Sequence, residues 1–318
     1  ASSCIPSCCP KLPSTPPSMP FTLRDYVAAV GVVVLWGLNF VAMKFALRDF
    51  TPFQLGAARY VFAVLPLILF IPKPKVAWRF LLLYGLFQGV GQFGFLFFAL
   101  HVGMTASLAS VLMQTQVFFT AILGFVLLHE RPARPLQIGL VLAACALACF
   151  GIGVAHQQTN AALAVTGAGL ILNLCAAFMW AASNVVARKT QQSTAHTGGY
   201  SVVGFVVWSS IVPVIPFCLL SLVMDAPNLR WQWTQAPLSS WLAVAYLGWM
   251  ATILAYALWT GLLSRHPANR VAPFSLGVPV VGLTTGMLAL GEVITAWQWA
   301  GIGFVMAALL CVLMLGRR

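Results

Sequence analysis

The sequence predicts an all-α integral membrane protein with ten transmembrane helices, built from two inverted five-helix repeats. Three observations lead to this prediction: the scarcity of charge, ten long apolar runs, and a match between the two halves of the chain. Of the 318 residues, 61% are hydrophobic and only 7% are charged, whereas soluble domains carry about 25% charged residues. This composition excludes a soluble enzyme, a secreted disulfide scaffold, a disordered protein and a nucleic-acid-binding protein.

The apolar runs define the membrane spans in chain order. A spanning helix needs roughly 20 mostly apolar residues, and breaking the chain at charges, prolines and glycine-polar clusters leaves ten such runs. The runs are continuous rather than alternating segments of about ten residues, which excludes membrane strands. The short connections between them leave no place for a large soluble domain. The predicted spans are 26–47, 52–72, 77–100, 104–128, 135–155, 165–188, 200–224, 238–263, 268–290 and 296–315.

Residues 1–24 are predicted to form a disordered cytoplasmic tail. The first twenty residues contain six Pro, five Ser and three Cys, so they cannot form a packed element. The apolar run after Arg24 is too long for a signal peptide and lacks a small-residue cleavage site. Met19 is an alternative native start, so it stays open whether residues 1–18 belong to the native protein.

The Lys and Arg residues give an independent test of this topology. With the N-terminus in the cytoplasm, the inside segments hold thirteen of the 17 cations and the outside segments hold three, namely Lys44, Arg48 and Arg230. The remaining cation, Arg59, lies inside the second span. An excess of Lys and Arg in cytoplasmic loops is the rule for membrane proteins, so both termini are predicted to be cytoplasmic.

The two halves of the chain match when one is shifted by 162 residues. Tyr84 then aligns with Tyr246 and Glu130 with Glu292, and a Gly follows each Glu nine residues later. We therefore predict one repeat over 25–155 and a second over 156–318. Because five spans is an odd number, the second repeat must enter the membrane upside down. Secondary transporters often use this plan, with the substrate site near the midplane between the repeats, and some channels share it.

Short motifs recur in the two repeats and along the chain. Each repeat carries Trp-Gly or Trp-Ala followed by Asn in its first span, and Glu where its fourth span ends. Further segments are LWGLNF at 35–40, GQFGFLF at 91–97, QTQVFF at 114–119 and RVAPFS at 270–275. Across about 25–315 these motifs resemble the EamA family of the drug/metabolite transporter superfamily, and in particular those members that export O-acetylserine and cysteine. The resemblance implies an exporter of small amino-acid-type metabolites in the bacterial inner membrane, working by alternating access.

Arg59 is the leading substrate-binding residue. Charged groups inside a bilayer are costly and usually functional, and a guanidinium can bind a substrate carboxylate through two parallel hydrogen bonds. Two structural interpretations stay open beside this one: a side chain that reaches to the interface, or a clamp on the carbonyls of a broken helix.

Polar amides mark further positions on the predicted site. Gln88 and Gln92 lie four residues apart and share one helix face, which indicates either a cavity lining or a helix contact with interhelical hydrogen bonds. Gln116, Asn39 and Asn184 are each expected to bond to a neighbouring helix or to face the substrate.

Aromatic residues complete the predicted site. Trp or Tyr in a span can form a cavity wall, pack against other helices or lie in the interfacial belt. The predicted wall consists of Trp36, Trp180, Tyr256 and Trp259.

The five acids, Asp25, Asp49, Glu130, Asp225 and Glu292, all fall at the ends of spans or in loops. A proton relay through a buried carboxylate is therefore unsupported, and we expect facilitated export or exchange.

Enzyme signatures are missing: no catalytic cluster, no metal-ligand spacing and no phosphate-binding loop is present. The expected partners are a small-molecule substrate and membrane lipids, with no nucleic acid and no cofactor, and the chain is a monomer or a dimer. A broad drug or aromatic-metabolite exporter is the alternative within transport. A membrane-embedded receptor or enzyme is the alternative outside it.

Overall fold

The computed structural model describes residues 21–128, 134–156, 165–194, 196, 199–266 and 268–315. Most of the predicted tail lies outside these ranges. The first helix, α1, begins at Leu23, so the last two residues of the predicted tail are helical, because a capping box fixes the helix start. The Thr22 side chain accepts a hydrogen bond from the Asp25 amide, and the Asp25 carboxylate accepts one from the Thr22 amide, which satisfies two free donors at the helix start.

The described residues are helical and contain no β-strand. Nine helical runs are long and apolar enough to cross a membrane, and Ala296–Val312 is a shorter apolar helix in the position of the tenth predicted span. The first half holds α1 (Leu23–Ala46), α2 (Pro52–Val64), α3 (Trp78–Tyr84), α4 (Gly94–His101), α5 (Ala106–Leu112), α6 (Gln116–Leu128) and α7 (Arg134–His156). The second half holds α8 (Gly167–Thr194), α9 (Val202–Ser209), α10 (Val214–Met224), α11 (Leu238–Ala245), α12 (Ala255–Arg265), α13 (Ala268–Val271), α14 (Gly277–Leu290) and α15 (Ala296–Leu315).

Short segments of other helix types interrupt several spans. Between α3 and α4 lies the π-helix η2 (Gly85–Phe93), and between α11 and α12 lies the π-helix η6 (Tyr246–Leu254). Because both have nine residues and occupy the third span of their half, they extend the match between the halves from sequence to backbone geometry. The 3-10 segments are η1 (Leu67–Leu69) after α2, η3 (Met113–Thr115) between α5 and α6, η5 (Gln232–Gln235) before α11, and η7 (Ala272–Leu276) between α13 and α14.

Prolines lie where the predicted continuous spans are broken. Pro213 stands between α9 and α10, and Pro273 lies in η7. Pro216 and Pro279 instead occupy the first turns of α10 and α14, where the missing amide costs no intrahelical hydrogen bond. The four prolines therefore separate helical segments or begin them, and none interrupts the middle of a regular helix.

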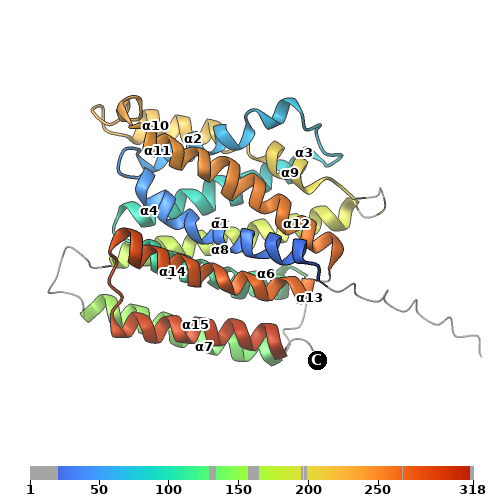
Figure 1. Ribbon diagram of the computed structural model, residues 1–318, viewed down its shortest axis with the longest axis vertical. Helices are drawn as coiled ribbons and strands as arrows, with labels where there is room; N and C mark the ends of the chain where they lie inside the picture. Colours follow the sequence, from blue (N-terminus) through green and yellow to red (C-terminus); the bar gives the residue numbers. More distant parts are fainter. Residues whose placement is uncertain are drawn as a thin grey trace, which may run out of the picture.

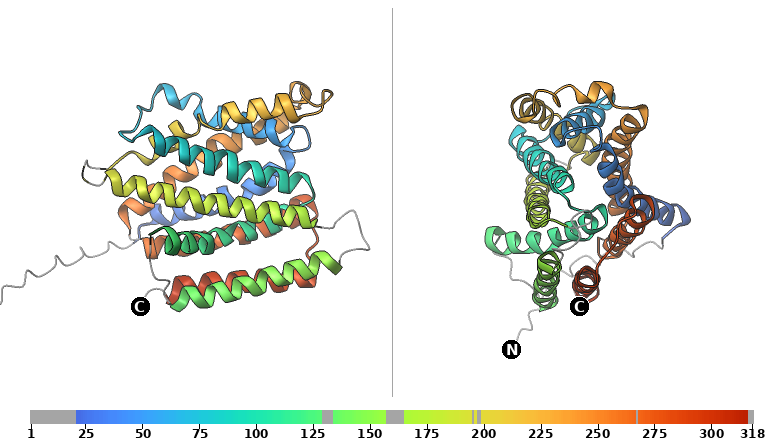
Figure 2. Two further views of the ribbon diagram at one scale, coloured as in Figure 1. Left: turned by 180° about the vertical axis from the view of Figure 1, so that it is seen from behind. Right: turned by 90° about the vertical axis from the view of Figure 1, so that its left-hand side faces the viewer.

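The two halves run in opposite directions. In Figure 1, α1 starts beside the grey N-terminal trace, whereas α8 starts at the opposite side of the molecule. Figure 2 shows the same arrangement from behind and, end-on, the helices grouped around a central region with α7 and α15 paired at its edge. α1 begins and α15 ends on the same side. We call this side the terminal end and the other the distal end.

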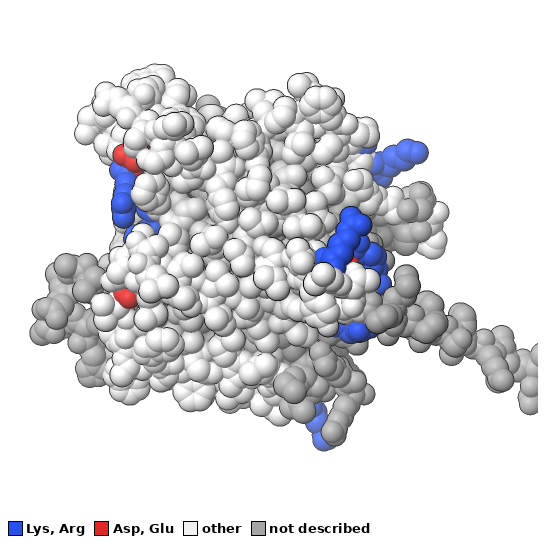
Figure 3. Space-filling model, viewed as in Figure 1, with Lys and Arg blue, Asp and Glu red and all other residues white. Residues whose placement is uncertain are grey.

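Exposed charge gathers at these two ends. Figure 3 shows Lys, Arg and the acids at the margins of the molecule, with an uncharged surface between them. Among the described residues, the terminal end carries Arg24, Lys73, Lys75, Arg79, Arg134, Arg188, Lys189, Arg265 and Arg270, and the distal end carries Lys44, Arg48 and Arg230. Arg59 lies between the two ends.

Candidate functional site

A cavity of about 480 Å³ lies between the two halves of the chain. Its wall is formed by α1 to α6 with η2 and η3 of the first half, and by α8, α9, α12, α14 and α15 with η6 and η7 of the second. The structure brings nine of the ten predicted site residues to this wall: Trp36, Asn39, Arg59, Gln92, Gln116, Trp180, Asn184, Tyr256 and Trp259.

Arg59 is a buried cation with neutral partners. Its side chain is 2% exposed. One terminal nitrogen donates to the Asn39 amide oxygen at 3.2 Å, and the other donates to the Thr252 hydroxyl at 3.0 Å. The Phe93 ring covers the guanidinium at 3.8 Å. None of these partners carries a negative charge, so the positive field of Arg59 at the cavity wall is not neutralised by the groups that hold it.

Thr252 reaches Arg59 because α2 and the π-helix η6 approach each other closely. A Cβ built on Gly248 would lie 2.5 Å from the Phe62 Cβ and 2.9 Å from the Arg59 carbonyl oxygen. A side chain at this position would push the two helices apart. The glycine therefore sets the distance across which the Thr252 hydroxyl accepts from Arg59.

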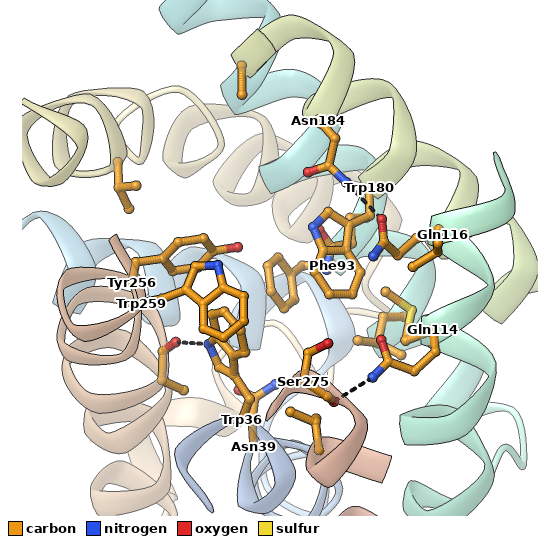
Figure 4. Close-up of a pocket in the computed structure, with 18 of the residues that line it drawn as sticks. Trp36, Asn39, Phe93, Gln114, Gln116, Trp180, Asn184, Tyr256, Trp259 and Ser275 are labelled. Atoms are coloured by element: carbon orange, nitrogen blue, oxygen red, sulfur yellow. Dashed lines mark hydrogen bonds between the residues drawn. The ribbon is translucent and has the colours of Figure 1, made fainter. Parts of the chain in front are cut away.

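One wall of the cavity is aromatic. The Trp36 indole donates to the Ala251 carbonyl at 3.1 Å, which ties α1 to η6. Its ring lies 5.4 Å from the Tyr256 ring and 5.5 Å from the Trp259 ring, measured between centroids. Figure 4 shows these three side chains together on one side of the cavity. This wall can enclose the apolar part of a small molecule.

The facing wall is more polar. Asn184 on α8 donates to the Gln116 side-chain oxygen at 2.8 Å, and Gln114 donates to the Ser275 carbonyl at 3.0 Å. Trp180 lies beside the Asn184–Gln116 pair (Figure 4). Gln114 and Ser275 were missed as site residues by sequence reasoning, because nothing in their spacing shows that η3 and η7 meet.

Gln88 and Gln92 separate instead of sharing one cavity face. Gln92 lines the main cavity and is 4% exposed. Gln88 lines a neighbouring cavity of about 20 Å³ that also touches Arg59 and Tyr256. There it donates to the Tyr256 hydroxyl at 3.1 Å and accepts from the Ser183 hydroxyl. Both lie in the π-helix η2, and the linings of the two neighbouring cavities share Arg59, Phe93 and Tyr256.

The cavity reaches toward the terminal end. Its lining includes Ala187 near the end of α8, Tyr200 before α9 and Val312 near the end of α15.

Toward the distal end, buried residues close the cavity. The side chains of Met43, Leu100 and Met104 are fully buried there. Lys44 donates to the carbonyls of Leu100 at 2.6 Å and Met104 at 3.1 Å, which ties α1 to the turn between α4 and α5.

The described acids lie at helix ends, as the sequence predicts, and each joins the two halves. The Glu292 carboxylate accepts from the backbone amides of Ala106 at 2.7 Å and Ser107 at 2.8 Å. Asp225 accepts from the Thr51 hydroxyl at 2.7 Å, and Asp49 accepts from the Ser240 hydroxyl.

At the terminal end, Asp25 lies 3.0 Å from both Arg265 and His266. Residues so far apart in the chain show no spacing signal, so sequence reasoning did not find the pairing of Asp25 with His266. Glu130, the sequence equivalent of Glu292, lies outside the described residues.

Comparison with known proteins identifies the family. The model of the EamA-like transporter family matches residues 24–152 and 167–314. The chain belongs to the EamA-like transporter family. It is therefore a multi-pass membrane transporter and not an enzyme, and the proposed resemblance is confirmed.

Relatives of this chain also indicate a transporter. A protein of Salmonella typhimurium named "probable amino-acid metabolite efflux pump" is 40% identical over 287 residues, 90% of this chain and 93% of its own. Its namesake in Escherichia coli K12 is 39% identical over the same shares. A crystal structure at 16% identity, covering 92% of this chain and 98% of the other, superposes with a TM-score of 0.59 and shows the fold alone. These relatives and the family make the chain a metabolite exporter.

Proposed function

We propose that the chain exports small amino-acid-type metabolites, such as cysteine or O-acetylserine, across a bacterial inner membrane by alternating access. Both termini are cytoplasmic in this proposal, because the terminal end carries most of the described Lys and Arg and such an excess faces the cytoplasm. The part of the cavity lining at Ala187, Tyr200 and Val312 then lies toward the cytoplasm in this conformation.

The observation that carries the substrate class is the environment of Arg59. Burying a charge without a counter-charge is costly, yet the groups that hold Arg59 are an amide, a hydroxyl and a ring. A substrate carboxylate entering the cavity supplies the missing negative charge. The aromatic wall of Trp36, Tyr256 and Trp259 encloses the rest of the molecule.

The distal contacts support alternating access. Glu292 holds the N-terminus of α5, where free amides and the helix dipole favour an anion. Gly286 of α14 allows this approach, because a Cβ there would lie within 2.6 Å of a Glu292 carboxylate oxygen. Opening toward the periplasm requires that these contacts between the halves break. In this proposal, substrate binding at Arg59 favours the rearrangement of the two halves.

The cavity lining supports uncoupled transport. None of its described residues is an acid, so we propose downhill export or exchange. Counterflow into proteoliposomes with and without an imposed pH gradient tests this part, and strong acceleration by the gradient would contradict it.

A second candidate within transport is export of aromatic metabolites. The observation favouring it is the group of three tryptophans on the cavity wall, Trp36, Trp180 and Trp259. Counterflow of cysteine and O-acetylserine against larger aromatic amino acids separates the two, because a site for small zwitterions excludes the bulkier competitors.

The central test is Arg59→Gln, measured with paired substrates. Loss of a charge-assisted hydrogen bond costs about 1.5–3 kcal/mol, so counterflow of cysteine should fall about 10- to 100-fold. Transport of cysteine methyl ester, which lacks the carboxylate, should change little.

Arg48→Gln is the matched control. Arg48 also lies over an aromatic ring, 5.1 Å from the centre of Phe45, but it is exposed and outside the cavity lining. Arg48→Gln should leave the transport of both cysteine and cysteine methyl ester unchanged. An unchanged ratio of acid to ester transport in folded Arg59→Gln protein would remove Arg59 from carboxylate recognition.

A further inference from the structure

A second concave surface lies on the outside of the bundle, between α1 and α12. This groove has a volume of about 890 Å³. One edge runs from Arg24 to Leu35 on α1, and the other from Leu254, the last residue of η6, to Arg265 at the end of α12. Each edge spans eleven residue steps, about 16 Å at the rise of an α-helix, which matches half of the roughly 30 Å hydrocarbon core of a bilayer.

The groove is apolar along its length and cationic at one end. Its exposed wall includes Val27 at 64% exposure, Val30 at 56% and Leu254 at 40%. Arg24 and Arg265 lie together at the terminal end of the groove. On the face shown in Figure 3, Lys and Arg gather at this end of the bundle.

One acid lies near the two arginines, and it is held inward. Asp25 is 3% exposed and lies 3.0 Å from Arg265 on one side and from His266 on the other. The Arg265 side chain keeps 41% of its surface exposed despite this contact, and Arg24 is exposed. The end of the groove therefore presents two guanidinium groups outward against one buried carboxylate.

We propose that this groove binds one anionic phospholipid of the leaflet at the terminal end. One acyl chain lies between α1 and α12, and the headgroup phosphate accepts hydrogen bonds from Arg24 and Arg265. Guanidinium groups suit phosphate oxygens through parallel hydrogen bonds, and basic pockets between transmembrane helices recognise acidic headgroups. The bound chain lies behind the α1–α12 contact that carries Trp36, Tyr256 and Trp259 of the cavity wall.

The test is native mass spectrometry of the full chain exchanged into mixed phosphatidylglycerol and phosphatidylcholine. The wild type should retain one phosphatidylglycerol per chain. The double variant Arg24→Gln with Arg265→Gln should weaken its retention about 30-fold, from the roughly 1 kcal/mol that each Arg contributes near an anionic headgroup.

A second variant keeps the charges and fills the groove. A Cβ at Gly261 meets nothing within 4 Å, so Gly261→Leu places a side chain in the groove without a clash and should also displace phosphatidylglycerol. Gly303→Leu on α15 is the matched control, because a Cβ there also meets nothing within 4 Å and Gly303 lies outside the groove. Equal retention of the two lipids, or unchanged retention in either the double variant or Gly261→Leu, would overturn the proposal.

Discussion

The two ends of the helix bundle join the repeats in different ways. At the distal end, three acids each accept hydrogen bonds from the opposite half: Glu292 from α5 amides, Asp225 from Thr51 and Asp49 from Ser240. At the terminal end, a single acid, Asp25, lies between Arg265 and His266, and the cavity lining reaches this side. Within the described residues, the end with more acid-mediated contacts between the halves is the end that is closed.

The acids that the structure describes lie outside the cavity lining and connect the two halves. In the proposed alternating-access cycle these contacts break and re-form, so the balance between the two ends is a balance between conformations. Removing acids at the distal end should therefore shift that balance in a measurable way.

The largest effect is expected for Glu292→Gln. The amide keeps one acceptor oxygen but loses the charge and the second acceptor, so it can satisfy only one of the Ala106 and Ser107 amides. A loss of about 2 kcal/mol corresponds to roughly 30-fold more of the distally open state. The measurement is the labelling rate of Met43→Cys, in a chain whose own eight cysteines are replaced, by a membrane-impermeant thiol reagent added on the distal side.

Met43 is fully buried when the distal end is closed, so its labelling reports opening of this end. The same variant should lower labelling of Ala187→Cys, which lines the cavity toward the terminal end. Equal labelling of Met43→Cys with and without Glu292→Gln would show that this carboxylate does not hold the distal end closed.

A smaller effect is expected for Asp225→Asn. The carboxylate oxygen accepts from the hydroxyls of Thr51 and Ser221, each at 2.7 Å, and an asparagine oxygen can still accept both at lower strength. A change of about 1 kcal/mol corresponds to roughly fivefold faster labelling of Met43→Cys. Thr51→Val removes the same contact from the other half. Similar effects of the single variants, with little further change in the double variant, would identify the Thr51–Asp225 bond as their common cause.

The architecture could be predicted because it depends on local composition. The predicted span 296–315 coincides with α15, and the predicted span 104–128 contains α5, η3 and α6 over Ala106–Leu128. Lipid-facing helices need long apolar runs wherever they pack, so these signals are visible in a single chain. The close approach of η6 to α2, with the Arg59 carbonyl beside Gly248, could not be predicted, because only the folded bundle brings these remote residues together.

The candidate site shows the same division. Arg59 stands out in the sequence because a charge in a span is rare, and Trp36 and Asn184 follow from the repeat. The contacts between these residues could not be predicted. Thr252 accepts a hydrogen bond from Arg59, Gln88 lines a neighbouring cavity, and Gln114 donates to the Ser275 carbonyl. Each of these depends on the distance between helices that are remote in the chain.

The smallest effect is expected at the terminal end, for Lys189→Gln. Lys189 is exposed near the end of α8, and exposed charges contribute little to a conformational balance because water screens them. The labelling rate of Met43→Cys should therefore stay within about twofold of the unmodified rate. This variant is the control for net charge, since it changes the net charge by one unit, as each distal variant does, but in the opposite direction and away from the distal contacts between the halves. A change as large as that of Glu292→Gln would mean that labelling follows the overall charge of the protein. It would contradict the claim that the acid-mediated contacts at the distal end set the conformational balance.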